Sequence, residues 1–119
     1  MHILIISGSA RPQRQSHHVA VAIQRKLSGR PEISCNLMDV REHPLPLLDF
    51  TFATHPSPSD VLKQWKEAVD AADAYIIVSP EHNSGYPGAL KNAMDYFYDE
   101  YAFKPLAIAT ASAGVLGGV

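Results

Sequence analysis

Four short apolar segments, separated by stretches of helical periodicity, constrain the fold of this chain more than any other feature. They cover residues 2–7, 32–39, 74–79 and 106–110. Three of them are nearly continuous apolar runs, which is typical of strands that a sheet buries on both faces, whereas residues 32–39 alternate like a half-buried strand. Strict alternation of strands with helices predicts one doubly wound, parallel α/β sheet.

Three amphipathic helices are expected between these strands. The first should end at Gly29 and Pro31, and the second should begin near Ser57, with a serine cap, Pro58 in the first turn and Asp60 three residues after the cap. The positions that recur at helical spacing are Ser16, Val19, Ala20, Ile23 and Leu27; Val61, Trp65, Ala68, Val69 and Ala72; and Ala89, Leu90, Ala93, Met94 and Phe97.

The composition is that of a single domain spanning residues 1–119. The chain is 46% hydrophobic and 18% charged, and its 10 Lys and Arg residues nearly balance 12 Asp and Glu residues, for a formal charge of −2. Near-neutral charge argues against nucleic acid as a partner, because duplex binding depends on many basic contacts to phosphate. No apolar run approaches the roughly 20 residues of a membrane helix, so we expect no membrane partner.

The single cysteine, Cys35, cannot form an internal disulfide. This suits a reducing, cytoplasmic setting. Because Cys35 falls in an expected buried strand with no basic neighbour, it is interpreted as an inert core thiol rather than a nucleophile.

The loop after the first strand combines hydroxyl and guanidinium groups. Residues 8–16 read Gly-Ser-Ala-Arg-Pro-Gln-Arg-Gln-Ser, and residues 1–30 hold five basic side chains and no acidic one. Such donors at the amino end of a helix suit a phosphate group. The alternative is that Ser16 only caps the helix while Arg11 and Arg14 are solvated. The spacing matches neither a dinucleotide-binding glycine fingerprint nor a P-loop.

A second loop, with the helix that follows it, holds the most specific motif. Residues 79–95 read Ser-Pro-Glu-His-Asn-Ser-Gly-Tyr-Pro-Gly-Ala-Leu-Lys-Asn-Ala-Met-Asp. This segment resembles the signature of the NAD(P)H-dependent FMN reductase family, flavodoxin-like enzymes that include azo-dye, quinone and chromate reductases. The matching residues are Pro80, Glu81, Asn83, Pro87, Gly88, Leu90, Lys91, Asn92 and Asp95. Residues 8–16 similarly resemble the family's phosphate loop, and residues 111–118 resemble its glycine-rich third flavin loop.

The resemblance implies a flavodoxin-like fold, FMN as cofactor and NADPH or NADH as co-substrate. The residues carried over by position for the FMN phosphate are Ser9, Arg11 and Ser16. Those for the isoalloxazine ring are Pro80, Glu81, His82, Asn83, Ser84 and Gly85, with Ser112 and Gly114 at its other edge. Small residues suit a flat ring that needs close main-chain approach. The alternative for residues 80–88 is an ordinary turn from strand to helix, with Pro87 in the first helical position.

The activity that the resemblance implies is that of an oxidoreductase. Hydride passes from NAD(P)H to flavin N5, and a small-molecule electron acceptor such as a quinone, an azo compound or a metal oxyanion takes the electrons. No acid–base residue is named, because the cofactor supplies the chemistry, and no metal site is expected. Two alternatives stay open: an FMN-binding electron carrier that does not oxidise NAD(P)H, and an inactive truncated remnant.

A hydrolase interpretation is disfavoured. Ser9, Glu81 and His82 have the side chains of a catalytic triad, but the adjacent Glu81 and His82 are poorly disposed to relay to one another. The chain also lacks a Gly-x-Ser-x-Gly elbow.

The sequence departs from the family pattern at three places. The phosphate loop is followed by His17 and His18, near where many members have Asn; they could bind phosphate when charged or be an ordinary surface pair. His82 stands where the family commonly has Tyr, and it can change charge near neutral pH. The flavodoxin-like strand order is 2-1-3-4-5, and this sequence stops in the loop after strand four, residues 111–119, so we expect the order 2-1-3-4 with the fifth strand missing. Apolar side chains at 75–78 and 106–109 would then meet water. We therefore expect either a C-terminally incomplete fragment or a homo-oligomer that covers this surface.

Overall fold

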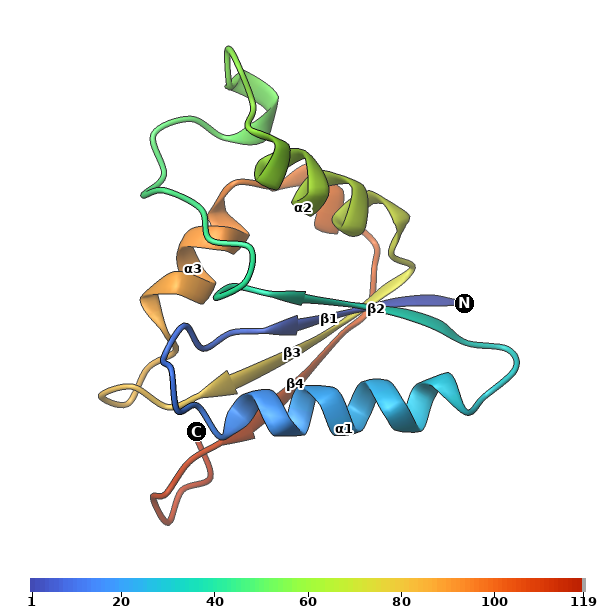
Figure 1. The fold of residues 1–119 in the computed structure, drawn as a ribbon, viewed down its shortest axis with the longest axis vertical. Helices are drawn as coiled ribbons and strands as arrows, with labels where there is room; N and C mark the ends of the chain where they lie inside the picture. The colour runs from blue at the N-terminus through green and yellow to red at the C-terminus, as the bar shows by residue number, and fades with distance from the viewer. Residues whose placement is uncertain (119) are drawn as a thin grey trace.

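Four parallel strands form a single sheet in a computed structural model that describes residues 1–118 (Figure 1). They are β1 (His2–Ser7), β2 (Ser34–Asp39), β3 (Ala74–Pro80) and β4 (Leu106–Ala111), arranged in the order β2-β1-β3-β4. Every strand pair is parallel. The predicted sheet and its order 2-1-3-4 are therefore confirmed. Val119, the last residue of the loop expected over 111–119, lies outside the described residues.

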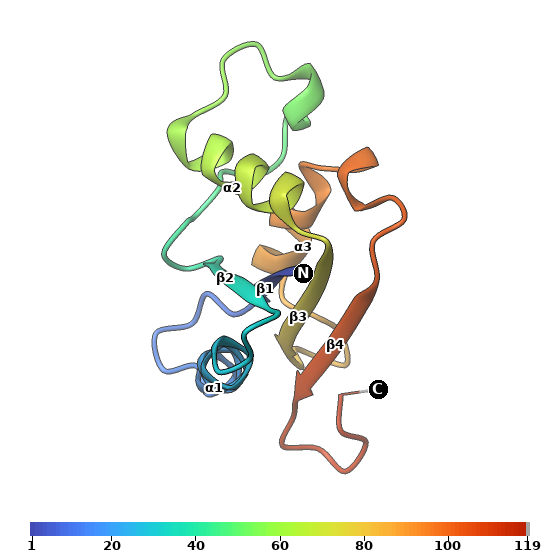
Figure 2. The ribbon, with the colours of Figure 1, turned by 90° about the vertical axis from the view of Figure 1, so that its right-hand side faces the viewer.

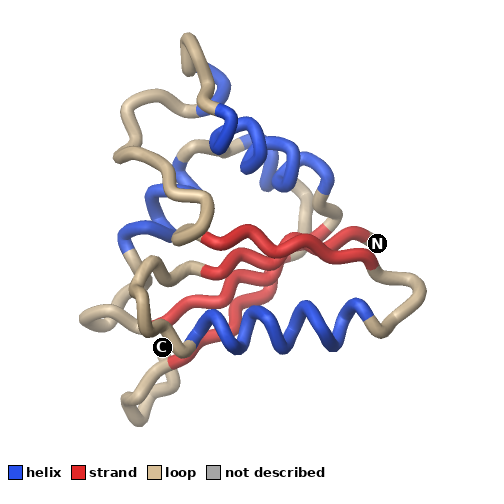
Figure 3. The backbone as a smooth tube through the Cα atoms, viewed as in Figure 1, coloured by secondary structure: helices blue, strands red, loops and turns tan. Residues whose placement is uncertain are grey.

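Helices cover both faces of the sheet. Helix α1 (Ser16–Ser28) lies against one face, and α2 (Asp60–Ala71) and α3 (Gly88–Asp95) lie on the other, as Figures 2 and 3 show. Two short 3₁₀ helices, η1 (Phe52–Thr54) and η2 (Asp99–Tyr101), belong to the connections on the side of α2 and α3. This is the three-layer arrangement that right-handed crossovers impose on a parallel sheet.

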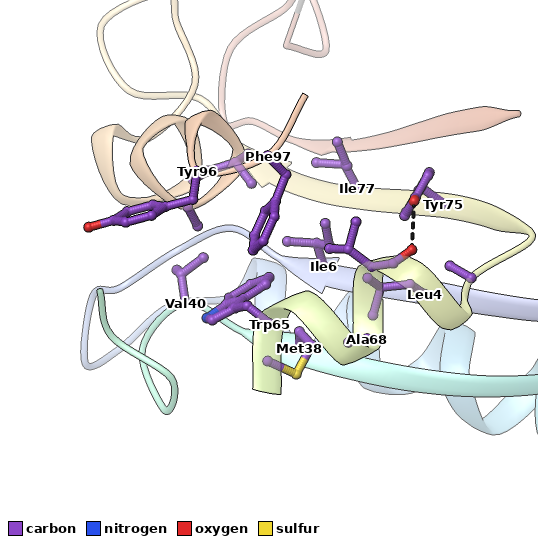
Figure 4. Packing of buried hydrophobic residues seen from close by; sticks show 14 of the residues in the cluster. Leu4, Ile6, Met38, Val40, Trp65, Ala68, Tyr75, Ile77, Tyr96 and Phe97 are labelled. Atoms are coloured by element: carbon purple, nitrogen blue, oxygen red, sulfur yellow. Dashed lines mark hydrogen bonds between the residues drawn. The ribbon is translucent and has the colours of Figure 1, made fainter. Parts of the chain in front are cut away.

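The larger hydrophobic core lies between the sheet and helices α2 and α3 (Figure 4). Trp65 is 1% exposed at its centre, and its indole Nε1 donates to the carbonyl oxygen of His43 at 2.9 Å. Tyr75 hydroxyl donates to the carbonyl oxygen of Val69 at 2.9 Å. Both aromatic residues therefore bury a large apolar surface without leaving a polar atom unpaired.

Two predicted boundaries are wrong by two residues. Helix α2 is capped by Ser59 rather than Ser57, because the extended backbone of Ser59 lets its hydroxyl accept the N–H of Leu62 at 3.2 Å. Strand β2 begins at Ser34 rather than residue 32, because a turn bond from the N–H of Ile33 to the carbonyl oxygen of Arg30 holds the preceding residues out of the ladder.

The predicted exposure is confirmed for β4 and wrong for β3. Leu106 and Ile108 of β4 are 52% and 64% exposed, and within residues 1–118 β4 pairs only with β3. Tyr75 and Ile77 of β3 are buried, because β3 lies between two strands and under α2 and α3, and the ring of Tyr101 packs edge-on against Tyr75. The outer edge of β4 is thus the open side of the sheet.

Candidate functional site

Three loops leave the carboxyl ends of β1, β3 and β4 and gather at one end of the sheet (Figure 1). They comprise residues 8–15, 81–87 and 112–118. From β1 the chain crosses to β2 on one side and, later, to β3 on the other, so the sheet has its topological switch point between β1 and β3. Parallel sheets bind ligands beside such a point.

The first of these loops, residues 8–15, is fixed against β3 by close backbone packing at Gly8. The N–H of Gly8 donates to the carbonyl oxygen of Val78 at 2.9 Å. A Cβ atom at Gly8 would lie 2.8 Å from Cδ2 of Leu90 and 3.0 Å from the same carbonyl oxygen. Glycine is therefore needed here for close approach to β3 and α3.

Two buried serines lie at this first loop, Ser9 within it and Ser16 directly after it. Ser9 is 1% exposed and Ser16 is 2% exposed. Ser16 is the first residue of α1, and within residues 1–118 its Oγ has no hydrogen-bond partner. The alternative that Ser16 caps the helix is wrong, since the cap residue is Gln15, which makes no side-chain cap bond. A buried unpaired hydroxyl beside the free N–H groups of a helix N-terminus fits an anionic ligand such as a phosphate.

The two arginines of the first loop have different surroundings. Arg11 is exposed, so its guanidinium is accessible to a ligand. Arg14 is not solvated, contrary to the alternative above: its side chain is 9% exposed and forms an ion pair with Asp39 at 2.5 Å. The N–H of Arg11 donates to Oγ of Ser9 at 3.4 Å, Ser16 begins α1, and Arg14 is directed toward β2.

The second loop contains a two-residue hairpin turn. His82 and Gly85 exchange backbone hydrogen bonds of 2.8 and 3.0 Å, and Asn83 and Ser84 have φ angles of 51° and 61°. Positive φ at both central residues defines a type I′ turn. Serine in this conformation is strained, which is a feature of functional loops. The turn and the residues before it are the set predicted to contact the ring.

Glu81 joins the second and third loops. Its Oε2 accepts the hydroxyl of Ser112 at 2.7 Å, and its N–H donates to the carbonyl oxygen of Ala111 at 3.2 Å. The N–H of Gly114 in turn donates to Oγ of Ser112 at 2.9 Å. The residues predicted for the two edges of the ring are therefore brought together, although they lie some thirty positions apart in the chain.

A groove of about 350 Å³ runs beside these two loops, between α3 and the exposed side of β4. Its polar end is formed by Ser79, Pro80, Glu81, Ser84, Gly85 and Thr110. Its apolar walls are Ile77, Leu90, Met94, Leu106 and Ile108, with Tyr86 at the turn. The predicted phosphate residues Ser9, Arg11 and Ser16 do not line this groove, whose walls are mostly apolar.

Several polar residues near the site hold the structure together, and sequence reasoning missed their roles. Asn92 of α3 accepts the N–H of Leu48 at 2.9 Å and donates to the carbonyl oxygen of Pro46 at 2.8 Å, which fastens the long loop after β2 to α3. Lys91 and Asp95 pair along the helix. The sequence identified Asn92 only as a residue of the family motif, because its hydrogen-bond partners are more than forty positions away in the chain.

Burial raises the pKa of two tyrosines far from these loops, Tyr75 and Tyr101, and raises that of Tyr101 more strongly. Burial raises the pKa of Tyr75, near the amino end of β3, to about 12. Among residues 1–118 no group of three or more His, Cys, Asp and Glu side chains could hold a metal ion, and no helix is long and apolar enough to cross a membrane.

Comparisons with known proteins identify the family of this chain. The family model described as NADPH-dependent FMN reductase matches residues 1–119. A quinone reductase of Pseudomonas putida is 32% identical over 98% of this chain, and an FMN-dependent NADPH-azoreductase of Staphylococcus aureus is 37% identical over 95% of it. The chain spans 62% and 61% of the lengths of these two relatives.

A solved structure shares the fold. The flavoenzyme NAD(P)H:(acceptor) oxidoreductase FerB from Paracoccus denitrificans superposes with a TM-score of 0.78 at 24% identity, over 98% of this chain and 64% of its own.

Proposed function

Because the chain belongs to the NADPH-dependent FMN reductase family, we propose that it acts as an FMN-dependent NAD(P)H oxidoreductase. The observation that most supports a flavin phosphate site is the buried hydroxyl of Ser16, which has no partner within residues 1–118 and lies at the amino end of α1. A fold does not leave a buried hydroxyl unpaired without cost, so a ligand oxygen at this position accounts for it.

We assign the phosphate to the first loop and the ring to the other two. Ser9, Arg11 and Ser16 contribute two hydroxyls and one exposed cation, which are suitable donors for a phosphomonoester. Residues 80–85, with Ser112 and Gly114, contribute a hydrogen-bonded turn and backbone groups for the ring in this proposal. The chemistry that FMN supplies when bound is hydride transfer at N5 from NADPH or NADH to an electron acceptor.

The acceptor class we propose is a quinone, an azo compound or a metal oxyanion. The names of the relatives from Pseudomonas putida and Staphylococcus aureus support the first two. The apolar walls of the groove beside the ring loop, including Leu90 and Ile108, are also suited to flat, largely apolar molecules. The homo-oligomer expected from the sequence stays a prediction, which sedimentation of the chain at several concentrations tests.

A titration of the purified chain with FMN, followed anaerobically by NADPH or NADH, tests the proposed function. We expect a perturbed flavin spectrum that saturates, and bleaching when the nicotinamide is added. Arg11→Met should weaken FMN binding, while Arg25→Met, which changes an exposed arginine of α1 outside the loop, should not. A flavin spectrum that stays that of the free cofactor contradicts the proposal. Saturable binding without bleaching favours the electron carrier.

A further inference from the structure

A buried ion pair lies directly under the first loop. Nη1 of Arg14 lies 2.5 Å from Oδ1 of Asp39, and Nη2 lies 2.5 Å from Oδ2. The side chains of Arg14 and Asp39 are 9% and 4% exposed. Asp39 is the last residue of β2, so its carboxylate lies at the same end of the sheet as the loop. Bidentate pairing of this kind fixes the orientation of both groups.

The pair also fixes the backbone of the first loop. Nη1 of Arg14 donates to the carbonyl oxygen of Ser9 at 2.6 Å. Asp39 Oδ1 accepts the N–H of Arg41 at 3.0 Å, and Nη1 of Arg41 donates to the next carbonyl oxygen, that of Ala10, at 2.9 Å. Two consecutive loop carbonyls are therefore bound on the side facing β2.

The orientation of these carbonyls decides where the adjacent N–H groups point. In a planar trans peptide the C=O and the following N–H point in opposite directions. Holding the carbonyls of Ser9 and Ala10 toward the two arginines turns the N–H groups of Ala10 and Arg11 the other way. Repulsive carbonyl oxygens are thus kept away from an anion, and the N–H of Ala10 is left for it. The N–H of Arg11 donates to Oγ of Ser9 at 3.4 Å, which places that hydroxyl beside the same turn.

Arg14 itself is poorly suited to be a phosphate ligand. Three of its hydrogen bonds go to Asp39 and Ser9, and its charge is neutralised by a carboxylate that is buried. Moving Arg14 to a ligand would leave the Asp39 carboxylate buried with only the N–H of Arg41 and His17, whose Nδ1 is 3.6 Å away. Among the described residues, the exposed Arg11 is not held by a buried carboxylate in this way.

We propose that Arg14 and Asp39 are a positioning pair, supported by Arg41, that presets the first loop for the phosphate of FMN without contacting it. This inference rests on the proposed function, since it requires the phosphate to bind at residues 8–16. It assigns Arg14, Asp39 and Arg41 a common effect on phosphate binding, which distinguishes them from residues that contact the ring.

The test compares FMN with riboflavin, which has the ring but no phosphate, by quenching of flavin fluorescence. Asp39→Asn and Arg14→Met should each raise the dissociation constant of FMN by roughly tenfold or more, which is the effect of losing one hydrogen bond to a charged group. The dissociation constant of riboflavin should change little. Arg41→Gln, a change at an exposed side chain, should act in the same direction with little effect on folding. Arg30→Met is the matched control, because Arg30 lies beyond the other end of α1 and is 60% exposed.

The possible outcomes separate the alternatives. Tighter FMN binding by Asp39→Asn would mean that the freed Arg14 is a direct ligand, and it would overturn the inference. Equal losses for FMN and riboflavin would mean that the pair only stabilises the fold, which also overturns it. If the unmodified chain binds FMN no better than riboflavin, the phosphate assignment is wrong and the inference falls with it. Failure of the unmodified chain to bind either flavin contradicts the proposed function itself.

Discussion

Replacing Ser16 with alanine should make the ligand-free protein more stable and its flavin binding weaker. The hydroxyl of Ser16 is 2% exposed and unpaired within residues 1–118. Burying a hydroxyl without a hydrogen bond costs about 1–3 kcal/mol. Ser16→Ala removes that cost and places a better helix former in the first turn of α1. Taking the lower bound, the free energy of unfolding should rise by about 1 kcal/mol, which corresponds to an increase of about 4 °C in Tm.

The same change should act in the opposite direction on FMN. If the hydroxyl donates to a phosphate oxygen, its loss removes one hydrogen bond to a charged group, which contributes about 1.5–3 kcal/mol. The dissociation constant of FMN should therefore rise by roughly 10-fold to 150-fold. Replacing a residue with a purely structural role would not stabilise the ligand-free protein and weaken FMN binding at the same time.

Thermal unfolding without flavin and fluorescence titration with FMN measure the two effects. Ser28→Ala is the matched control on the same helix, because Ser28 is exposed at its last turn and should alter neither quantity appreciably. A lower Tm for Ser16→Ala would show that the hydroxyl has an internal partner. An unchanged dissociation constant with a higher Tm would remove Ser16 from the phosphate site.

Three further substitutions test separate parts of the structure. Gly8→Ala should lower the free energy of unfolding by about 1–3 kcal/mol, since its Cβ would meet Leu90 at 2.8 Å, and an unchanged urea midpoint would contradict the close packing. Ser84→Gly should raise Tm by relieving a φ of 61° that costs roughly 1 kcal/mol, and a fall in Tm would mean that another contact holds the turn. Burial raises the folded-state pKa of Tyr75 from its ordinary 10 to about 12, so its contribution is complete below pH 10 and is lost as pH rises toward 12. Tyr75→Phe should flatten the decline of stability across that range, and an equally steep decline would exclude Tyr75 as its cause.

The features that the sequence predicts well depend on neighbours along the chain. The nearly continuous apolar run at residues 2–7 predicts a buried strand, and the structure confirms it as β1. The alternation of strands and helices then leaves few topologies, because crossovers in parallel sheets are right-handed. The order of the sheet follows from those two constraints and the family resemblance.

The features that the sequence could not predict depend on residues that meet only in the folded chain. Arg14 and Asp39 are 25 positions apart, and nothing in the local pattern distinguishes Arg14 from Arg11, which stays exposed. Glu81 meets Ser112 across 31 positions for the same reason. The sequence predicted Ser57 as the cap of α2, whereas the cap is Ser59. Two serines flank Pro58, and only the backbone conformation distinguishes between them.

The polar residues around the site therefore divide by whether the fold already uses their hydrogen-bonding groups. Arg14 and Asn92 use theirs on other parts of the chain, so they shape the loops and have little left for a ligand. Ser16 is buried with its hydroxyl unused within residues 1–118, and Arg11 is exposed at the surface. Because an unused buried donor is unfavourable until a ligand occupies it, stability and flavin affinity should change in opposite directions at Ser16 and in the same direction at Arg14. Whether stability and affinity change in opposite directions or in the same direction therefore distinguishes ligand residues from positioning residues. A match to the family motif alone does not make that distinction.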